Sequence, residues 1–340
     1  MISRILKEEQ VTQLRKYLAH YDDIVITCHV SPDGDAIGAS LGLYHLLTTL
    51  GKNVNVVTPD LAPRNLAFLP GTKEIVAYSK YTDFATQLIA NAKLIFCLDF
   101  NALGRLDMMA DIIGESTAKK VMIDHHLFPE EFCDITISNS SMSSTCELLF
   151  RTICSLGLFN EINKAVAECL YTGMMTDTGN FSYNSNRADL YVIVAELIRK
   201  GIDKDRIYTR AMNTSTEERL RLLGFAISER MEVFPDANAA LITLTKEDLE
   251  RFSYKKGDTE SLVNVPLGIP TIKWVIFMRQ ENDFIKISAR SKGDFAVNTI
   301  CEKYFNGGGH KNASGGEFQG TMPQAVSIFH KIIDNINEIK

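Results

Sequence analysis

The chain has 340 residues, of which 45% are hydrophobic, and a formal net charge of −6. This composition is typical of a globular protein with room for two domains. The net negative charge argues against a broad basic surface for long duplex nucleic acid, whereas a few cationic groups and metal ions would still accept a short anionic substrate.

The first half of the chain alternates helix-like and strand-like segments. Hydrophobic periodicity predicts strands at 24–28, 53–58, 94–98 and 120–123, and helices at 8–20, 36–50, 83–92, 103–115, 145–156 and 161–175. Strands that alternate with helices of this length indicate parallel βαβ units with helices on both faces of the sheet. The predicted fold class is therefore α/β, with a doubly wound and mostly parallel sheet.

The second half changes its periodicity. Helices are predicted at 187–200, 216–231, 295–305 and 322–338, and strands at 239–245, 274–279 and 284–290. Strands and helices on a smaller sheet indicate an α+β domain. We therefore predict a first domain over 1–185, connecting helices over 186–232 and a second domain over 233–340. The long helix over 216–231 offers a surface for a homodimer.

Cysteine usage and hydrophobicity indicate the compartment. The seven cysteines are scattered and form no Cys-x-x-Cys pair, which argues against a disulfide framework and a thiolate zinc site. The first residues have no apolar signal-peptide core, and no apolar stretch approaches the length of a membrane span, about 18 residues. We expect a cytoplasmic protein that does not contact a membrane.

Four segments end in acidic residues or histidines. These candidate ligands are His29, Asp33 and Asp35 after the first predicted strand, Asp99 after 94–98, Asp124, His125 and His126 after 120–123, and Asp177 after a Gly- and Met-rich segment. Ligands bind beyond the carboxyl ends of strands in open α/β sheets. Carboxylates suit Mg²⁺ or Mn²⁺, and imidazole favours transition metals. The pattern predicts a divalent-metal site.

Simpler readings exist for each ligand taken alone. A calcium-binding EF-hand loop that starts at Asp33 fails, because Ile37 and Tyr44 occupy positions that need oxygen ligands. Asp99 and Asp177 by themselves suit a helix cap or a turn. The spacing of Gly38 and Gly42 most simply permits close helix packing.

The adjacent histidines are harder to explain as ordinary core residues. Their side chains diverge at the end of a strand, so only one of them can reach the metal ligands. We expect the other histidine to face the substrate.

A glycine-rich segment follows the last predicted strand. Gly307, Gly308 and Gly309 precede His310, and consecutive glycines can turn their N–H groups into a concave nest that accepts phosphate oxygens. Arg290, at the end of the preceding strand, favours anion binding because a guanidinium matches phosphate geometry. A glycine-rich loop between a helix and a strand, without any ligand, is the alternative.

Together these motifs resemble the four motifs of the DHH phosphoesterase superfamily, and the Gly307–His310 segment resembles the hallmark of the associated DHHA1 domain. The two-domain form is similar to the nanoRNase and 3′-phosphoadenosine-5′-phosphate phosphatase branch. The resemblance implies a phosphoric-ester hydrolase that degrades short oligoribonucleotides and linear dinucleotides to mononucleotides and removes the 3′-phosphate of 3′-phosphoadenosine 5′-phosphate. The alternatives are a single-strand DNA exonuclease of the same superfamily and a non-catalytic nucleotide-binding protein. A pyrophosphatase would lack the triple-glycine segment.

The resemblance also implies roles for individual residues. Two divalent ions, Mn²⁺ first and Mg²⁺ or Co²⁺ as alternatives, would lie in a cleft between the domains and activate a hydroxide for in-line attack. His29, Asp33 and Asp99 would hold one ion, and Asp35, Asp99, His125 and Asp177 the other. His126 would face the scissile phosphate, Asp124 would orient the His pair, Arg105 would reach a substrate phosphate, and Arg290 with Gly307, Gly308, Gly309 and His310 would bind the far end of the nucleotide.

Overall fold

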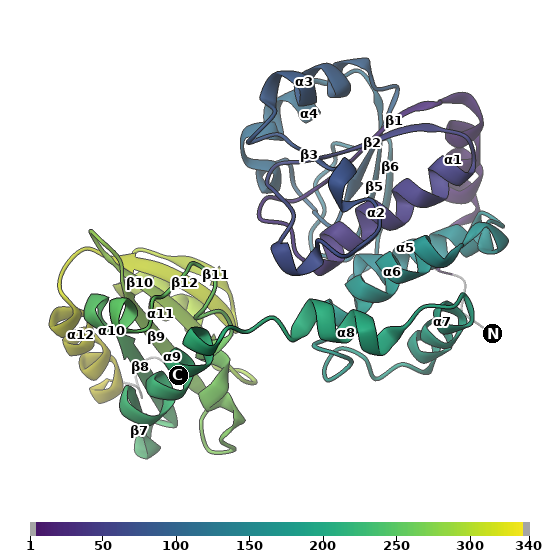
Figure 1. The fold of residues 1–340 in the computed structure, drawn as a ribbon. Coiled ribbons are helices and arrows are strands. Elements are labelled where there is room, and N and C mark those ends of the chain that lie inside the picture. The colour runs from purple at the N-terminus through teal and green to yellow at the C-terminus, as the bar shows by residue number, and fades with distance from the viewer. Residues whose placement is uncertain (1–4, 336–340) are drawn as a thin grey trace. The chain divides into compact units, whose positions relative to one another are not determined.

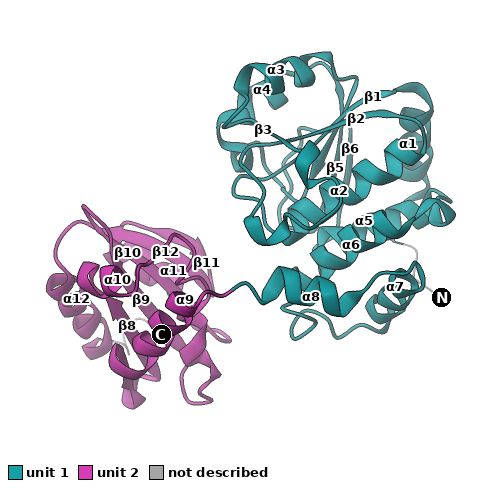
Figure 2. Cartoon of the chain, in the orientation of Figure 1, with its two compact units in different colours: residues 1–214 teal, residues 215–340 magenta. Residues whose placement is uncertain are grey.

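The computed structural model describes residues 5–335 and divides into two compact units between Thr214 and Ser215 (Figure 2). The division falls within the segment 186–232 that we predicted as connecting helices. Helices α7 (Ala188–Arg199) and α8 (Lys204–Met212) belong to the first unit, and α9 (Glu217–Glu229) belongs to the second. The predicted connector is therefore shared between the two units.

The first unit is built on a six-stranded sheet, in which every pair of neighbouring strands is parallel. Its strands are β1 (Asp23–Cys28), β2 (Asn53–Thr58), β3 (Val76–Ala77), β4 (Leu94–Leu98), β5 (Lys119–Asp124) and β6 (Ile135–Ser138). They lie in the order β3-β2-β1-β4-β5-β6, which confirms the doubly wound α/β fold. The order reverses between β1 and β4, and such a switch point is where doubly wound sheets bind ligands.

Helices cover both faces of this sheet (Figure 1). The remaining helices of the unit are α1 (Glu8–His20), α2 (Gly34–Thr49), α3 (Thr82–Asn91), α4 (Ala110–Glu115), α5 (Thr145–Ser155) and α6 (Lys164–Asp177). Alternate strand residues point to opposite faces. Ile24 and Ile26 therefore join the core under α2, α5 and α6, whereas Val25 and Ile95 join the core under α3 and α4.

Four elements of this unit differ from the prediction. The helix predicted over 103–115 is a 3₁₀ segment, Leu103–Met109, followed by the short α4, because Asp107 has φ 50° and ψ −124°. Strands β3 and β6 were missed because they have only two and four residues. Helix α8 was also missed, and only Ile207 and Ala211 of its residues are buried. Its weak apolar face gives little signal.

The second unit holds a mixed six-stranded sheet in the order β11-β12-β10-β9-β8-β7. The strands are β7 (Met231–Phe234), β8 (Ala239–Leu244), β9 (Trp274–Gln280), β10 (Ile285–Ser291), β11 (Gly308–His310) and β12 (Ala313–Phe318). Only β8 and β9 pair in parallel among the described strands of this sheet. The predicted α+β class is therefore confirmed.

Helices also flank the second sheet. They are α9, α10 (Lys246–Arg251), α11 (Val297–Tyr304) and α12 (Met322–Asp334). Trp274 is fully buried, stacks on Phe295 and donates a hydrogen bond from its indole nitrogen to Ala237 O at 3.1 Å. Positions 336–338 of the last predicted helix lie outside the described residues. Within 5–335, none of the helices combines the length and hydrophobicity needed to cross a bilayer.

The glycine-rich segment, which we predicted to bind phosphate, forms part of a β-hairpin. Gly308–His310 pair with β12 in an antiparallel register. A Cβ atom on Gly307 would overlap Gly315 O, which means that only glycine allows the chain to approach β12 so closely at this position. Gly307 therefore serves strand packing, and the contact of Gly307, Gly308 and Gly309 with a phosphate stays a prediction.

Candidate metal centre

The predicted ligands gather at the switch point of the first sheet. His29 follows β1, Asp99 follows β4, and Asp124 ends β5, and these three strands are neighbours. Asp33 caps α2 by accepting hydrogen bonds from the backbone nitrogens of Asp35 and Ala36 at 2.9 and 3.1 Å. The parallel strands thus present their carboxyl ends to one place, as expected from the fold.

Three groups of donor atoms converge there, with the atoms of each group within 4.8 Å of one another. The groups are His29, Asp33 and Asp99; Asp35, His125 and Asp177; and Asp99, His125 and His126. All six residues predicted to bind metal are therefore members of these groups. Asp99 belongs to two of them, which is the position expected of a carboxylate shared between two ions.

The distances between donor atoms suit shared cations. His29 Nε2 lies 3.5 Å from Asp99 Oδ2, and His125 Nε2 lies 3.6 Å from Asp177 Oδ2 and 3.7 Å from Asp99 Oδ1. Ligand atoms bind such ions at about 2.0–2.2 Å, so two atoms on one ion lie about 3–4 Å apart. A neutral imidazole nitrogen and a carboxylate oxygen are both electron-pair donors, and they face each other favourably only across a cation or a proton.

Backbone carbonyls fix the tautomers of the two histidines. His29 Nδ1 donates to Val30 O at 2.8 Å, and His125 Nδ1 lies 3.4 Å from Met142 O. A carbonyl can only accept, so both imidazoles turn Nε2 toward the carboxylates. This is the arrangement in which histidine binds metals while its other nitrogen is held in place.

The carboxylates carry opposite pKa shifts. Burial raises the pKa of Asp35 well above its usual value, and the charges of Asp99, Asp177 and Asp33 raise it further. Burial and the charges of Asp99 and Asp33 also raise the pKa of Asp177 to about 6. Burial alone would raise the pKa of Asp99 too, but the hydrogen bond with His29 and the charges of His29, His125 and His126 lower it to about 2. Crowded carboxylates of this kind favour cation binding.

These shifts predict a pH-dependent stabilisation by metal. At pH 7.5, a hundredfold excess of Mn²⁺ over its Kd should add about 2.7 kcal/mol, or about 5–10 °C in Tm. At pH 5 the increase in Tm should shrink, because Asp177 is then largely protonated and must release its proton to bind the ion. Without metal, the stability of the protein should instead fall as pH rises. Asp177 and Asp35 have higher pKa values in the folded than in the unfolded protein, so they reduce stability as pH rises through about 6. Thermal scans with Mn²⁺ and with EDTA at both pH values test this, and an equal shift at both would contradict it.

The start of α5 supports the site, and the sequence analysis missed it. Asp35 accepts hydrogen bonds from the backbone nitrogens of Thr145 at 2.6 Å and Cys146 at 2.9 Å. The Thr145 hydroxyl donates to Asp99 Oδ1 at 2.8 Å. Unpaired N–H groups of a helix N-terminus favour negative charge, so α5 orients two of the candidate ligands. The Ser-Ser-Thr run before a predicted helix was the available signal.

A buried glutamate holds the start of α5. Glu147 is fully buried and accepts hydrogen bonds from the backbone nitrogen and the hydroxyl of Ser143 at 2.9 and 2.8 Å. Its carboxylate also accepts from Arg151 Nη2 at 2.7 Å and from Arg187 Nη2. This network ties the segment that contacts Asp35 and Asp99 to helices α5 and α7.

Glycines let α2 and α6 approach each other. A Cβ atom on Gly38 would lie 2.6 Å from Cys169 O, and one on Gly42 would lie 2.9 Å from a methyl carbon of Leu170. The predicted packing role of this glycine pair is confirmed. A Cβ atom on Gly173 would lie 2.7 Å from Asp35 Oδ1, so the same close approach brings Asp35 and the end of α6 to one site.

The two adjacent histidines are held by different partners, and both have a ring nitrogen within 4 Å of Asp99 Oδ1. Their rings lie edge to face with centroids 4.8 Å apart. Asp124 accepts hydrogen bonds from His126 Nδ1 at 2.7 Å and from the backbone nitrogen of His126 at 3.0 Å. The hydrogen bond with Asp124 raises the pKa of His126. Asp124 therefore orients His126, whereas His125 is oriented by Met142, so the prediction that Asp124 orients both is wrong for His125.

Arg105 lies near enough to His126 to affect its charge. Its positive charge lowers the pKa of His126, against the stronger effect of Asp124. The backbone carbonyl of Arg105 accepts a hydrogen bond from Val30 N at 2.8 Å, which anchors the segment 103–109 beside the loop after β1. The guanidinium itself is exposed, as a contact to substrate requires.

The predicted anion-binding residues of the second unit lie on neighbouring strands. Arg290 on β10 donates to Ala289 O at 2.9 Å and to Ser314 O at 3.4 Å. Within residues 5–335, no carboxylate forms an ion pair with it, and burial lowers its pKa. His310 ends the exposed β11, whereas the next residue, Lys311, pairs with Asp294 at 2.9 Å. Arg290 is thus a half-buried cation whose hydrogen-bond partners are the backbone carbonyls of Ala289 and Ser314.

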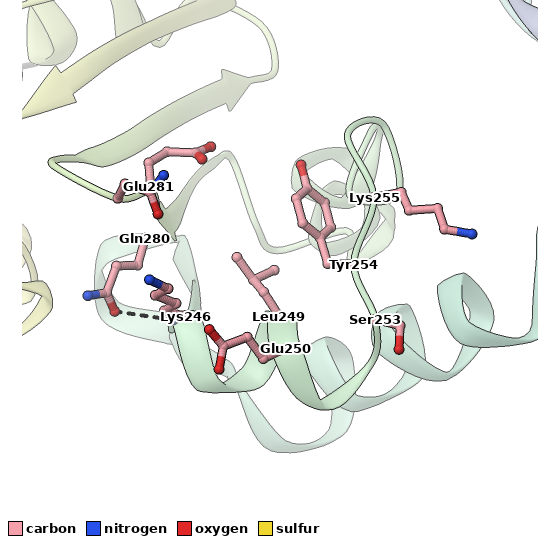
Figure 3. Close-up of a pocket in the computed structure, with 9 residues that line it drawn as sticks. Lys246, Leu249, Glu250, Ser253, Tyr254, Lys255, Gln280 and Glu281 are labelled. Carbon is pink, nitrogen blue, oxygen red and sulfur yellow. Dashed lines mark hydrogen bonds between the residues drawn. The ribbon is translucent and has the colours of Figure 1, made fainter.

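A separate pocket of about 470 Å³ lies in the second unit (Figure 3). Lys246, Leu249, Glu250, Ser253, Tyr254, Lys255, Gln280, Glu281 and Asn282 line it. None of the predicted site residues is among them. Two lysines and two glutamates leave the pocket without net charge, so it does not favour an anionic substrate over a neutral one.

The first unit is therefore an α/β fold with a candidate divalent-metal centre at the switch point of its sheet. Residues 23–174 match the family model described as DHH family, N-terminal domain, and residues 238–338 match the DHHA1 domain. The chain belongs to the DHH family, whose members are metal-dependent phosphoesterases.

Known relatives agree with this assignment. The chain is 51% identical to an exopolyphosphatase-related protein from Bacteroides fragilis of known crystal structure, with a TM-score of 0.95 over 98% of both chains. It is 28% identical over 305 residues to the bifunctional oligoribonuclease and PAP phosphatase NrnA of Bacillus subtilis, which is 89% of this chain and 92% of that protein. RecJ from Thermus thermophilus, solved in complex with Mn²⁺, gives a TM-score of 0.57 at 12% identity, over 100% of this chain and 56% of RecJ. The last similarity shows the fold alone.

Proposed function

We propose that this protein hydrolyses short oligoribonucleotides and linear dinucleotides to mononucleotides and also removes the 3′-phosphate of 3′-phosphoadenosine 5′-phosphate. The observation that carries the proposal is the convergence of six metal-capable side chains at the switch point of a doubly wound sheet. The similarity to the Bacillus subtilis relative, which spans nearly all of both chains, supports the choice of substrates.

The geometry supports two divalent ions, with Mn²⁺ as the first choice. His29, Asp33 and Asp99 would hold one ion, and Asp35, His125 and Asp177 would hold the other, with Asp99 shared. Such ions, when bound, lower the pKa of water and neutralise charge on phosphate oxygens.

The remaining residues at the site would act on the substrate directly. His126 keeps Nδ1 on Asp124, which leaves Nε2 for a phosphate oxygen, and its raised pKa favours the charged form that stabilises an anion. Arg105 would add a second positive charge near His126. These groups would bind the phosphate more tightly as charge develops on it.

The second unit would hold the far end of the substrate. Arg290 supplies a half-buried cation without a carboxylate partner among the described residues, and His310 lies at the exposed end of β11.

A panel of substrates with Mn²⁺ tests the proposed function. Diadenylate, a five-nucleotide RNA and 3′-phosphoadenosine 5′-phosphate should be hydrolysed, whereas pyrophosphate, inorganic polyphosphate and long single-stranded DNA should be poor substrates. Preferred turnover of pyrophosphate, polyphosphate or long DNA would overturn the substrate assignment. Saturable nucleotide binding without any hydrolysis would instead support a non-catalytic protein.

Replacing His310 by Ala should raise KM for diadenylate about 10-fold and change kcat less than about twofold. A hydrogen bond to a charged group contributes about 1.5–3 kcal/mol, and His310 would contact a part of the substrate that does not react. Steady-state kinetics measure both constants. His330→Ala, which removes an exposed histidine of α12 in the same unit, is the matched control and should leave KM unchanged. An unchanged KM in the His310 variant would contradict the proposed contact between His310 and the substrate.

A further inference from the structure

Phe128 is the most exposed of the large hydrophobic residues in the described part of the chain, with 86% of its surface accessible. It follows His126 by only two residues, so the two Cα atoms lie at most about 7 Å apart. An exposed phenylalanine has an energetic reason to be buried in a complex. Its position beside the candidate phosphate-binding His126 indicates that this complex is the one with substrate.

The backbone holds the ring outward at an energetic cost. Phe128 has φ 58°, in the left-handed region that residues with a Cβ atom rarely adopt. Strain of this kind persists where surrounding contacts enforce it, and it is often found at functional sites. Pro129, whose ring fixes its own φ, follows directly and stiffens the turn.

Contacts on both sides of Phe128 enforce this conformation. The Asn101 side chain donates to Leu127 O at 2.7 Å, and Glu130 N donates to Asn101 O at 2.7 Å. The Glu130 carboxylate in turn accepts from Leu103 N at 3.0 Å. Both neighbours of the Phe128–Pro129 pair are thereby tied to the segment that directly follows Asp99. These hydrogen bonds hold the loop, which follows β5, against the segment that follows β4, and both segments also carry ligands of the candidate metal centre.

We propose that Phe128 is the stacking platform for the nucleobase next to the scissile phosphate. This inference rests on the proposed function, because it requires a nucleotide substrate. In a nucleotide the base lies one sugar away from its phosphate, so a phosphate at His126 places the base near the ring of Phe128. Aromatic side chains bind single-stranded bases through their faces with little sequence preference. Phe128 would therefore determine affinity for nucleotides as a class.

The test compares Phe128→Asn with Phe128→Trp. Asparagine tolerates the left-handed backbone and so removes the ring without disturbing the loop, whereas tryptophan keeps a stacking face. For diadenylate, Phe128→Asn should raise KM about 5- to 100-fold with little change in kcat, and Phe128→Trp should keep KM near the wild-type value. Phe84→Ala, which removes an exposed phenylalanine from α3, is the matched control and should behave as the wild type.

A substrate without bases separates stacking from other effects. On a dinucleotide analogue with abasic residues in both positions, Phe128→Asn and the wild type should have the same KM. Three results for Phe128→Asn would each overturn the proposal. They are an unchanged KM on diadenylate, an equal rise in KM on the abasic analogue, and a changed oligomeric state with an unchanged KM.

If the wild type does not hydrolyse diadenylate, the proposed function fails. The Kd of a 2-aminopurine dinucleotide with Mn²⁺, followed by base fluorescence, then tests Phe128 by itself, and an equal Kd for wild type and Phe128→Asn overturns it.

Discussion

Replacing Asp99 by Asn is expected to lower kcat for metal-dependent hydrolysis by about 1,000-fold or more. Asp99 faces His29 Nε2 at 3.5 Å and His125 Nε2 at 3.7 Å, and it is the carboxylate common to two of the ligand groups. An amide supplies one neutral oxygen where the site needs a shared anion. Metal ions contribute several kcal/mol of transition-state stabilisation, and about 4 kcal/mol corresponds to 1,000-fold in rate.

The fold of the Asp99→Asn variant should remain intact. Asp99 has φ 63°, and asparagine is among the residues that best tolerate this region. The Thr145 hydroxyl can still donate to the remaining oxygen. Circular dichroism should therefore match the wild type, and calorimetric titration with Mn²⁺ should show weaker or fewer sites. Asp111→Asn, at an exposed position of α4, is the control. Wild-type turnover in the Asp99 variant would disprove the shared-ion assignment.

Replacing Glu147 by Gln should destabilise the first unit by about 3–5 kcal/mol, the usual cost of breaking a buried ion pair. The Glu147 side chain is fully buried, and only 2% of the Arg151 side chain is accessible. The variant removes the charge that Arg151 and Arg187 share. It also weakens the acceptor for Ser143, so the start of α5 should hold Asp35 and Asp99 less firmly. We expect Mn²⁺ affinity to fall about 10- to 100-fold.

Urea unfolding of the first unit and Mn²⁺ titration measure the two effects of Glu147→Gln. Glu168→Gln is the matched control, because Glu168 faces Lys164 at the same i,i+4 spacing in the same unit at 4.0 Å, with 58% of the lysine side chain accessible. Surface pairs contribute about 0–1 kcal/mol. If both variants lose the same small amount of stability, the buried network does not support the site as described.

The accuracy of the sequence-based predictions followed the strength of the local signals. Strands such as β4 are continuous apolar runs with every residue buried, so periodicity placed them closely. Short elements such as β6 and β11 were missed, because three or four residues give little periodic signal. The hairpin at the three glycines was not predicted either, because glycines in sequence do not show which segment they pack against. Whether glycine provides a nest or close strand packing depends on its spatial neighbours, and Gly315 meets Gly307 only because the chain folds back in a hairpin.

The sequence by itself determined which residues can bind metal, because acidic and imidazole side chains placed just after apolar segments must meet where parallel strands end. Only the tertiary structure decided how those side chains are held. Thr145 contacts Asp99 and Arg187 pairs with Glu147 across distant segments, and Asn101 holds the residues on both sides of the Phe128–Pro129 pair. Such contacts arise when separate elements pack together, and they leave no periodic pattern in the chain.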